Sequence, residues 1–317
     1  MKQFMQTHKV YLTPLSPIHI GCGEDFEPTN YVIDGTTLFN FEPSQLVLNE
    51  REKTELVNAI NRLDLLAIQR FFLNQKDKAI ACSYHFADVS DGLAQDYKSR
   101  VGKVAQRESD GNKVINNLSI ERTAFLPVHH LPYIPGSGVK GAVATALLDQ
   151  AHQNKNNPKV GVKDHGKLLK EYIGEFEKSK LRYVKFSDFT PLHHAESKIY
   201  YALNFAGQYR TFKSDLTLME DSFYSISDLQ KSLNAFYLPV FRKEMELLQS
   251  RNLVSTQYLK SIEKLCSLPN VVLIRLGKNG ADSKTYQGEN IAQIKIMGAK
   301  GSPLVFKDSS TTVWLAG

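Results

Sequence analysis

A glycine-rich segment near the middle of the chain is the strongest constraint on how this sequence can fold. Residues 134–142 read Ile-Pro-Gly-Ser-Gly-Val-Lys-Gly-Ala and lead directly into the helix-forming residues 143–148. Glycine allows sharp turns and close approach to a ligand, and the first amides of a helix are unpaired donors at its positive end. The sequence therefore predicts a glycine loop at a helix start that suits phosphate, with Gly136, Ser137, Gly138 and Lys140 as contacts.

Two familiar nucleotide-binding motifs do not account for this segment. It satisfies G-x-G-x-x-G, but Pro132 and Pro135 disfavour the strand that should precede a dinucleotide-binding loop. Asp149 and Asp164 are poorly placed for the acidic residue expected about 20 positions on. A P-loop is excluded because Lys140 lies between a valine and a glycine. A glycine helix start that binds no ligand remains the alternative.

Composition and charge indicate a folded protein with a mild preference for polyanions. The 317 residues are 42% hydrophobic and 10% aromatic, and the formal net charge of +6 favours a nucleic-acid partner, although solvated lysines also give such a charge. Cys22, Cys82 and Cys266 are far apart and lack C-x-x-C spacing, so neither a disulfide framework nor a thiolate zinc site is indicated. Residues 1–9 lack the apolar core of a signal peptide, and no run reaches the roughly 18 apolar residues of a membrane span. We therefore expect a cytoplasmic protein with no membrane partner.

The chain has no internal repeat and is expected to form a single elaborated domain over residues 1–317. Apolar residues at helical spacing predict a helical insertion at about 43–75 and another at about 227–266. Asp34-Gly35 between two apolar runs predicts a hairpin. Residues 88–117 hold hardly any large apolar side chain, which predicts a mobile, thumb-like excursion. Its cations, which are possible RNA contacts, are Lys98, Arg100, Lys103 and Arg107.

Two further glycine segments carry ligand-binding chemistry. The first contains His19, Gly21 and Gly23. The second follows an apolar run at residues 271–276, which predicts a buried strand that ends in a glycine loop. A guanidinium, ammonium groups and close backbone amides together suit a phosphodiester chain, although such a loop is also an ordinary exposed hairpin. The residues of this third site are Arg275, Gly277, Lys278, Gly280, Ser283 and Lys284.

Taken in order, these motifs resemble the RAMP superfamily of CRISPR-associated proteins over residues 10–290. The middle glycine segment is common to many RAMP proteins. The opening segment 12–23, the Tyr-Val-Ile-Asp-Gly sequence at 31–35, and the late Arg-Leu-Gly loop with Ser283-Lys284-Thr285 are similar to a narrower family. That family comprises the fifth subunits of the type III-A (Csm) effector complex.

The resemblance implies an α+β fold with an RRM-like (ferredoxin-like) RAMP core, helical insertions and glycine-rich loops. It also implies a non-catalytic subunit that binds CRISPR RNA, caps the 3′-end side of the complex and aids maturation of that RNA in antiviral defence. The implied partners are CRISPR RNA, target RNA, neighbouring RAMP backbone and small subunits, and a trimming nuclease. The residues themselves agree with a binding role, since they assemble no catalytic group and indicate no cofactor.

Two enzymatic alternatives remain open. His19 is a candidate general acid for RNA cleavage, as in processing endoribonucleases of the same superfamily. The chain could also be a RAMP backbone subunit that cleaves target RNA with the help of a metal ion. An aspartate would then take part in cleavage, and the candidates are Asp25, Asp88 and Asp91. Aspartates in turns and helix caps are the simpler interpretation of these residues.

No metal site is predicted from the histidines, because neighbours on a strand point to opposite faces. The adjacent pairs are His129-His130 and His193-His194. A last alternative is a protein-interaction subunit that docks through residues 227–266 and makes no direct RNA contact.

Overall fold

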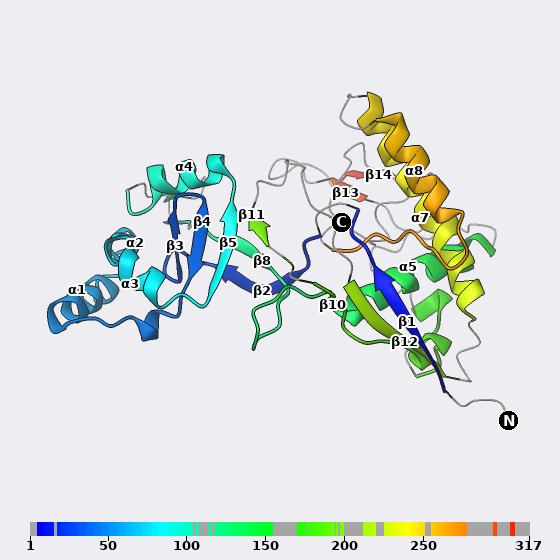
Figure 1. The fold of residues 1–317 in the computed structure, drawn as a ribbon, viewed down its shortest axis with the longest axis horizontal. Helices are drawn as coiled ribbons and strands as arrows, with labels where there is room; N and C mark the ends of the chain where they lie inside the picture. Colours follow the sequence, from blue (N-terminus) through cyan, green and yellow to red (C-terminus); the bar gives the residue numbers. More distant parts are fainter. Residues whose placement is uncertain are drawn as a thin grey trace. The chain divides into compact units, whose positions relative to one another are not determined.

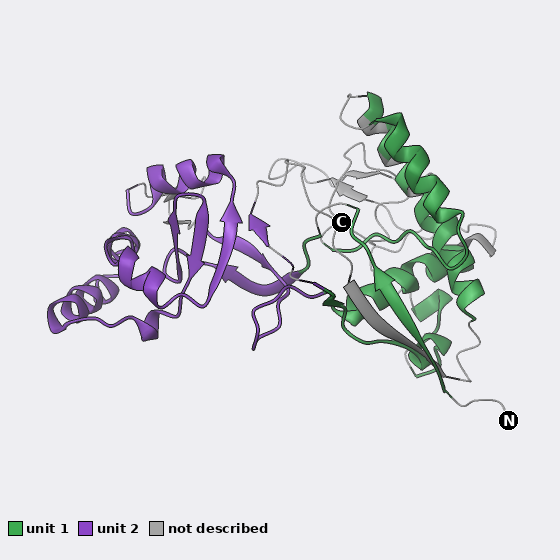
Figure 2. Ribbon diagram, in the orientation of Figure 1, with its two compact units in different colours: residues 1–20, 134–192, 207–317 green, residues 21–133, 193–206 purple. Residues whose placement is uncertain are grey.

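The computed structural model divides the chain into two compact units, each described here by itself. Unit 1 comprises Met1–Ile20, Ile134–Leu192 and Gly207–Gly317, and unit 2 comprises Gly21–Tyr133 and His193–Ala206 (Figure 2). The sequence predicts one elaborated domain, and this division is a finer arrangement that it does not predict. The residues that the structure describes are 5–15, 18–103, 106–107, 114–115, 118–154, 170–175, 177–193, 195, 197–199, 212–219, 225–250, 255–277, 294–296 and 305–307.

A four-stranded antiparallel sheet forms one layer of unit 1. Its central strand β12 (Phe212–Met219) pairs along its whole length with β1 (Met5–Leu12). The other edge of β12 pairs with β9 (Val184–Phe186) and β10 (Thr190–Pro191) (Figure 1). A second pair, β13 (Ile294–Ile296) and β14 (Val305–Lys307), belongs to the same unit, and a 3-10 helix, η2 (Lys180–Tyr183), precedes β9.

The central helix of unit 1 is α5 (Gly136–Asn154), which contacts β9 and α7 (Ile226–Ser250). Every residue from Ala142 to Leu148 is buried, as expected for a helix that is covered on all sides. The next helix, α8 (Thr256–Cys266), packs against α7. Helices therefore occupy the segment at 227–266 where a helical insertion is predicted.

Two local predictions for unit 1 are corrected by the structure. The segment 136–141 is not a loop, because α5 begins at Gly136 and these residues form its first turns. Residues 271–276 do not join a sheet. Asn234 of α7 instead bonds this extended segment at both Val271 O (3.3 Å) and Leu273 N (3.3 Å). A helix side chain thus supplies the partners that a neighbouring strand would have supplied.

Unit 2 is built on a mixed sheet in the order β11-β5-β4-β3. The strands are β3 (Tyr31–Asp34), β4 (Thr37–Asn40), β5 (His85–Val89) and β11 (Lys198–Ile199). The hairpin predicted from Asp34-Gly35 is confirmed, with Gly35 at φ +58°. A separate antiparallel pair joins β2 (Gly21–Phe26) to β8 (Ile120–Thr123).

Helices cover both faces of this sheet. Alternate residues of β3 point to opposite sides, so Tyr31 packs with Tyr97 of α4 (Asp91–Arg100), whereas Val32 packs with Phe71 and Phe72 of α2 (Leu65–Asn74). The remaining helical elements of unit 2 are η1 (Pro43–Gln45), α1 (Glu50–Asn61) and α3 (Lys76–Ala81). Helices therefore lie where an insertion at about 43–75 is predicted.

The expected mobile excursion at 88–117 is corrected over its first half. Residues 91–100 form α4, and both Tyr97 and Val101 are almost completely buried in the core. One large ring and one valine at the right spacing anchor this helix, although its composition is polar. Beyond it, β6 (Gln106–Arg107) pairs with β7 (Val114–Ile115). None of the helices in the described ranges is long and apolar enough to cross a membrane.

Candidate functional site

His19 of the first predicted glycine segment meets Gly277 of the third within unit 1. Gly277 adopts φ +86°, and a Cβ atom there would lie 2.4 Å from the carbonyl oxygen of His19. Only glycine permits this direct contact between the two main chains. Nearby, the Tyr258 hydroxyl of α8 donates a hydrogen bond to Leu15 O (3.2 Å), which fixes the opening segment against the helices. The main chains of His19 and Gly277 therefore form a rigid junction.

The start of α5 is held by the Phe-Ser-Asp sequence at residues 186–188, which begins with the last residue of β9. The Gly136 N–H donates to Asp188 Oδ1 (2.9 Å), so a carboxylate already occupies this first helical amide. A Cβ atom at Gly136 would lie 2.4 Å from Phe186 O, which explains the need for glycine. A bridge between Ile134 and Phe189 aligns the two segments. Gly136 therefore serves close packing within the fold.

Beside this packed side, the first turns of α5 present an open, basic side. Ser137 and Gly138 are exposed, and a Cβ atom at Gly138 would meet no atom within 4 Å. Lys140 is half-buried, and its pKa is lowered first by burial and then by the neighbouring ammonium group of Lys185 on β9. Two neighbouring positive charges favour a bound anion.

Arg275 is linked to α5 through a buried tyrosine. The Tyr237 hydroxyl of α7 donates to Ala142 O (2.8 Å), one turn beyond Gly138. Burial raises the pKa of Tyr237, and the positive charge of Arg275 nearby acts in the opposite direction. Arg275 thus lies close to the same helix that carries Ser137 and Lys140.

Other predicted contacts are not part of this grouping. Gly21 and Gly23 are in strand β2 of unit 2 and not in a loop, which corrects the prediction of a glycine loop at this position. The pairing of β2 with β8 shifts in register between Gly21 and Asp25, and Gly23 takes φ +79° there. A glycine in the left-handed region is typical of such a bulge. Lys278, Gly280, Ser283 and Lys284 lie outside the described residues.

The cations predicted for the thumb belong to unit 2. Arg100 at the end of α4 pairs with Asp96 (2.7 Å), and Lys103 Nζ donates to Lys98 O (3.0 Å). Only the main chain of Arg107, in β6, is described. Their role as RNA contacts stays a prediction.

The residues of the enzymatic alternatives are spread over separate elements. Asp25 in β2 accepts a hydrogen bond from Ser119 Oγ (3.4 Å), Asp88 lies in β5 and Asp91 begins α4. Across the described part of the chain, no three His, Cys, Asp or Glu side chains are grouped to hold a metal ion. His129 and His130 follow one another in a turn, where His130 takes φ +52°, and His194 lies outside the described ranges.

Sequence reasoning assigned no role at this site to three residues that shape it: Lys185, Tyr237, and Asp188 of the Phe-Ser-Asp motif at 186–188. Lys185 had a detectable signal, because alternation along the sequence of β9 places its side chain on the face opposite the buried Val184. Asp188 follows that strand, but only the fold brings its carboxylate to Gly136. Tyr237 is one of several aromatic residues on a long helix, and nothing in its spacing singles it out.

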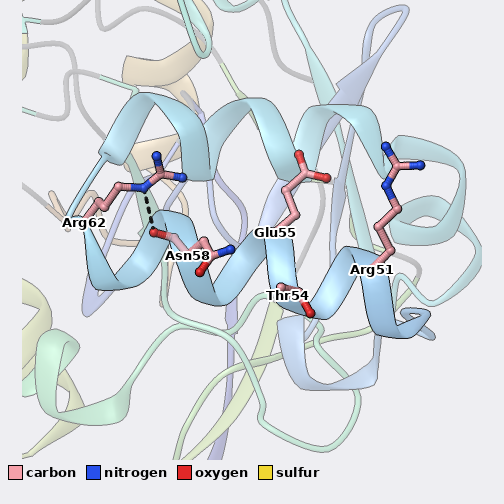
Figure 3. A pocket seen from close by; sticks show the side chains of 5 residues that line it. All are labelled: Arg51, Thr54, Glu55, Asn58 and Arg62. Atoms are coloured by element: carbon pink, nitrogen blue, oxygen red, sulfur yellow. Dashed lines mark hydrogen bonds between the residues drawn. The ribbon is translucent and has the colours of Figure 1, made fainter.

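A hollow on the outer face of α1 is a weaker candidate. About 750 Å³ of open space lies over Arg51, Thr54, Glu55, Asn58 and Arg62 (Figure 3). These side chains follow one helix in a row, and Arg62 Nε donates back to Asn58 O (3.1 Å). They do not converge on a common point, so this face has the character of a solvated helix surface.

Comparison with known families decides the classification. The model of the RAMP superfamily matches residues 11–290. The chain belongs to the RAMP superfamily. This RAMP protein is similar to two curated relatives named "CRISPR system Cms protein Csm5". It is 26% identical to the relative from Methanocaldococcus jannaschii over 205 residues, covering 57% of this chain and 42% of the relative. It is 27% identical to the relative from Streptococcus thermophilus over 173 residues, covering 54% and 45%.

Solved structures support the RAMP fold. A crystal structure of T. onnurineus Csm5 matches with a TM-score of 0.52 and 15% identity, over 84% of this chain and 89% of that one. A chain of a cryo-EM structure of a Csm-crRNA-target RNA ternary complex in a type III-A CRISPR-Cas system matches with a TM-score of 0.53 and 16% identity, over 86% and 85%. The predicted α+β RAMP fold and the resemblance to the fifth Csm subunit are both confirmed. The matches to the curated relatives cover less than half of each relative's length.

Proposed function

We propose that this RAMP protein is a CRISPR-RNA-binding subunit of a type III-A (Csm) effector complex and has no nuclease activity of its own. Its place is the 3′-end side of the complex, where it holds the CRISPR RNA and aids its maturation. The support is the similarity to relatives named Csm5 and to a chain from a complex that contains CRISPR RNA and target RNA. Its partners in the cytoplasm are those RNAs, neighbouring RAMP and small subunits, and a trimming nuclease.

One observation carries the binding role: Lys140 of α5 lies near Lys185 of β9 beside the exposed Ser137, and Arg275 lies near Tyr237, whose hydroxyl bonds to α5. Cations neutralise phosphates without reading sequence, and a guanidinium in addition donates a planar pair of hydrogen bonds. The exposed Ser137 adds a hydroxyl, and the open space over Gly138 lets a backbone approach closely. This arrangement suits the sugar-phosphate chain of a guide RNA of any sequence.

A titration of RNA binding against salt tests this function. In filter-binding assays with the full chain and labelled RNA, we expect Lys140→Gln with Lys185→Gln, or Arg275→Ala, to weaken binding to all sequences. The slope of log K against log salt should become shallower by about 0.7 for each lost phosphate contact. Arg275→Lys should restore most of the slope, because it restores the charge.

Lys53→Ala is the matched control, since it removes an exposed cation that pairs with Glu50 on α1 of unit 2. It should leave the slope unchanged. If the unit 1 variants also leave it unchanged, RNA does not bind at this site.

The absence of nuclease activity needs a separate assay. The isolated chain is incubated with labelled guide and target RNA, with and without Mg²⁺ or Mn²⁺. We expect no cleavage that follows the purified protein. Cleavage lost in His19→Ala would indicate the general-acid alternative, and loss in Asp25→Ala, Asp88→Ala or Asp91→Ala would indicate the metal-assisted one.

A further inference from the structure

Unit 2 contains a cluster of aromatic rings around a buried arginine, which no predicted motif explains. His85 begins β5 and Tyr84 directly precedes it, Arg122 lies on β8, and Phe125 and His130 lie in the segment that follows β8. The rings of Tyr84 and His130 are 4.5 Å apart, and those of Phe125 and His130 are 6.0 Å apart and nearly parallel, at 19°. His85 in turn stacks on the core residue Phe26 at 6.0 Å and 4°. The stacked rings extend from the core towards the surface.

The arginine at the centre of the cluster is incompletely satisfied. Arg122 is 7% exposed, and its guanidinium carbon lies 3.5 Å from the centre of the Phe125 ring and 4.9 Å from that of Phe26. It hydrogen-bonds to Tyr84, but its Nη2 atom is buried without a hydrogen-bond partner. The neighbouring His130 Nδ1 is also buried without a partner. A buried charge in this state is costly, and such groups commonly mark sites shaped for a ligand.

The two imidazoles are neutral near pH 7. Burial, followed by the positive charge of Arg122, lowers the pKa of His85 to about 4. The same two causes lower the pKa of His130. The cluster therefore presents flat, uncharged rings backed by one fixed cation. A cation on one face of a ring withdraws electron density from it, which favours stacking of an electron-rich partner on that assembly.

The outer end of the cluster is open to solvent. Tyr84 is 40% exposed, and Val128, in the same turn as His130, is 81% exposed. We propose that Tyr84, His130 and Phe125, backed by Arg122, form a platform on which one unpaired nucleobase of RNA stacks. This inference rests on the proposed RNA-binding function and assigns to unit 2 a base contact that is separate from the phosphate contacts of unit 1. Near-parallel rings beside a cation fit a planar base better than an aliphatic protein side chain.

A short RNA that contains 2-aminopurine tests the platform, because the fluorescence of this base falls when it stacks. With the full chain, we expect quenching on binding. Tyr84→Ala should abolish most of the quenching and weaken binding about tenfold, whereas Tyr84→Phe should keep both. Phe86→Ala is the matched control, since Phe86 is 69% exposed and lies two residues further along the same segment. It should behave as the wild type.

The outcomes separate this inference from the proposed function. If the wild-type chain retains RNA on filters but does not quench the 2-aminopurine fluorescence, the platform is overturned and RNA binding stands. The same holds if RNA bound to Tyr84→Ala is quenched as strongly as RNA bound to the wild type. If the wild-type chain retains no RNA, both are overturned. A Tyr84→Ala variant that keeps RNA but loses a protein subunit of the complex would assign the cluster to a protein interface instead.

A second readout needs no variant. Ultraviolet crosslinking of the wild-type chain to the same RNA, followed by peptide mapping, should place crosslinks at Tyr84, Phe125 or His130. Crosslinks confined to other peptides would also overturn the platform.

Discussion

The two units of this RAMP protein use opposite means to bring distant residues together. In unit 1 the joining contacts are made by the main chain, as where Gly277 lies against His19 and Gly136 against Phe186. In unit 2 the chemistry is gathered by side chains, as where Arg122 lies over Phe125. The difference teaches that two of the glycines visible in the sequence, Gly136 and Gly277, mark close packing, whereas the ring cluster carries no sequence motif at all.

The largest effect is expected for Gly277→Ala, with Gly23→Ala as its counterpart in unit 2. Both glycines have positive φ, but only Gly277 faces an atom, at 2.4 Å from its Cβ position. The left-handed backbone and the overlap together should cost about 3 kcal/mol of the free energy of unfolding at Gly277, against about 1 kcal/mol at Gly23. Urea denaturation measures both. Equal losses would show that unit 1 does not depend on this main-chain junction.

The next comparison lies within one helix. Gly136→Ala places a methyl group 2.4 Å from Phe186 O and should destabilise by about 2 kcal/mol, because both groups belong to rigid main chain. In Gly138→Ala the new methyl group points into open space, so the better helix propensity of alanine should raise the free energy of unfolding by about 0.5–1 kcal/mol. Thermal unfolding followed by circular dichroism gives the sign of each change. A stabilising Gly136→Ala would contradict the close packing described here.

A pH effect is expected in unit 2. Because the pKa of His85 is lowered from its ordinary value of 6.5 to about 4 in the fold, the fold favours the neutral imidazole. The contribution of the neutral His85 ring to the free energy of unfolding is therefore fully present above about pH 6.5 and is lost as the pH falls towards 4. Given the partial exposure of this ring, we expect a loss of about 1–2 kcal/mol over that range. His85→Phe keeps the ring, so its stability should fall less than that of the wild type between these two pH values.

The smallest effect is expected at the start of α5. Asp188→Ala removes the carboxylate that accepts from Gly136 N and should cost about 1 kcal/mol, whereas Asp188→Asn keeps an acceptor and should cost less. Chemical denaturation resolves this difference. If both substitutions are neutral, water satisfies the amide equally well, and the contact contributes little to unit 1.

Local signals in the sequence predict local structure well. Asp34-Gly35 predicts the hairpin because a tight turn depends only on neighbouring residues, although the two turn residues are Gly35, which has positive φ, and Thr36. The apolar run at 271–276 predicts a strand, yet the segment is held by the side chains of Gln230 and Asn234 on α7. Apolar content alone does not say which partner will bond the backbone.

The candidate site is predictable only in part. Glycine and lysine at 136–140 can be found from their pattern, but the position of Lys185 beside Lys140 depends on the packing of β9 against α5. The ring cluster is harder still, because Tyr84, Arg122 and His130 come from three segments that have no shared spacing. Polar composition likewise hides α4, which packs against the core through Tyr97 and Val101, with Leu93 and Ala94 partly buried beside them.

The pairing of β1 with β12 sets an order for folding during synthesis. Met5–Leu12 leaves the ribosome first, but its antiparallel partner Phe212–Met219 follows only after more than half of the chain. The core of unit 2 comes almost entirely from the continuous stretch Gly21–Tyr133, so it can form while β1 is still unpaired. A nascent strand with a free edge is a site for wrong pairing between chains. Slow elongation between these two strands should therefore lower the yield of correctly folded protein more than slow elongation after Met219, when β1 already has its partner.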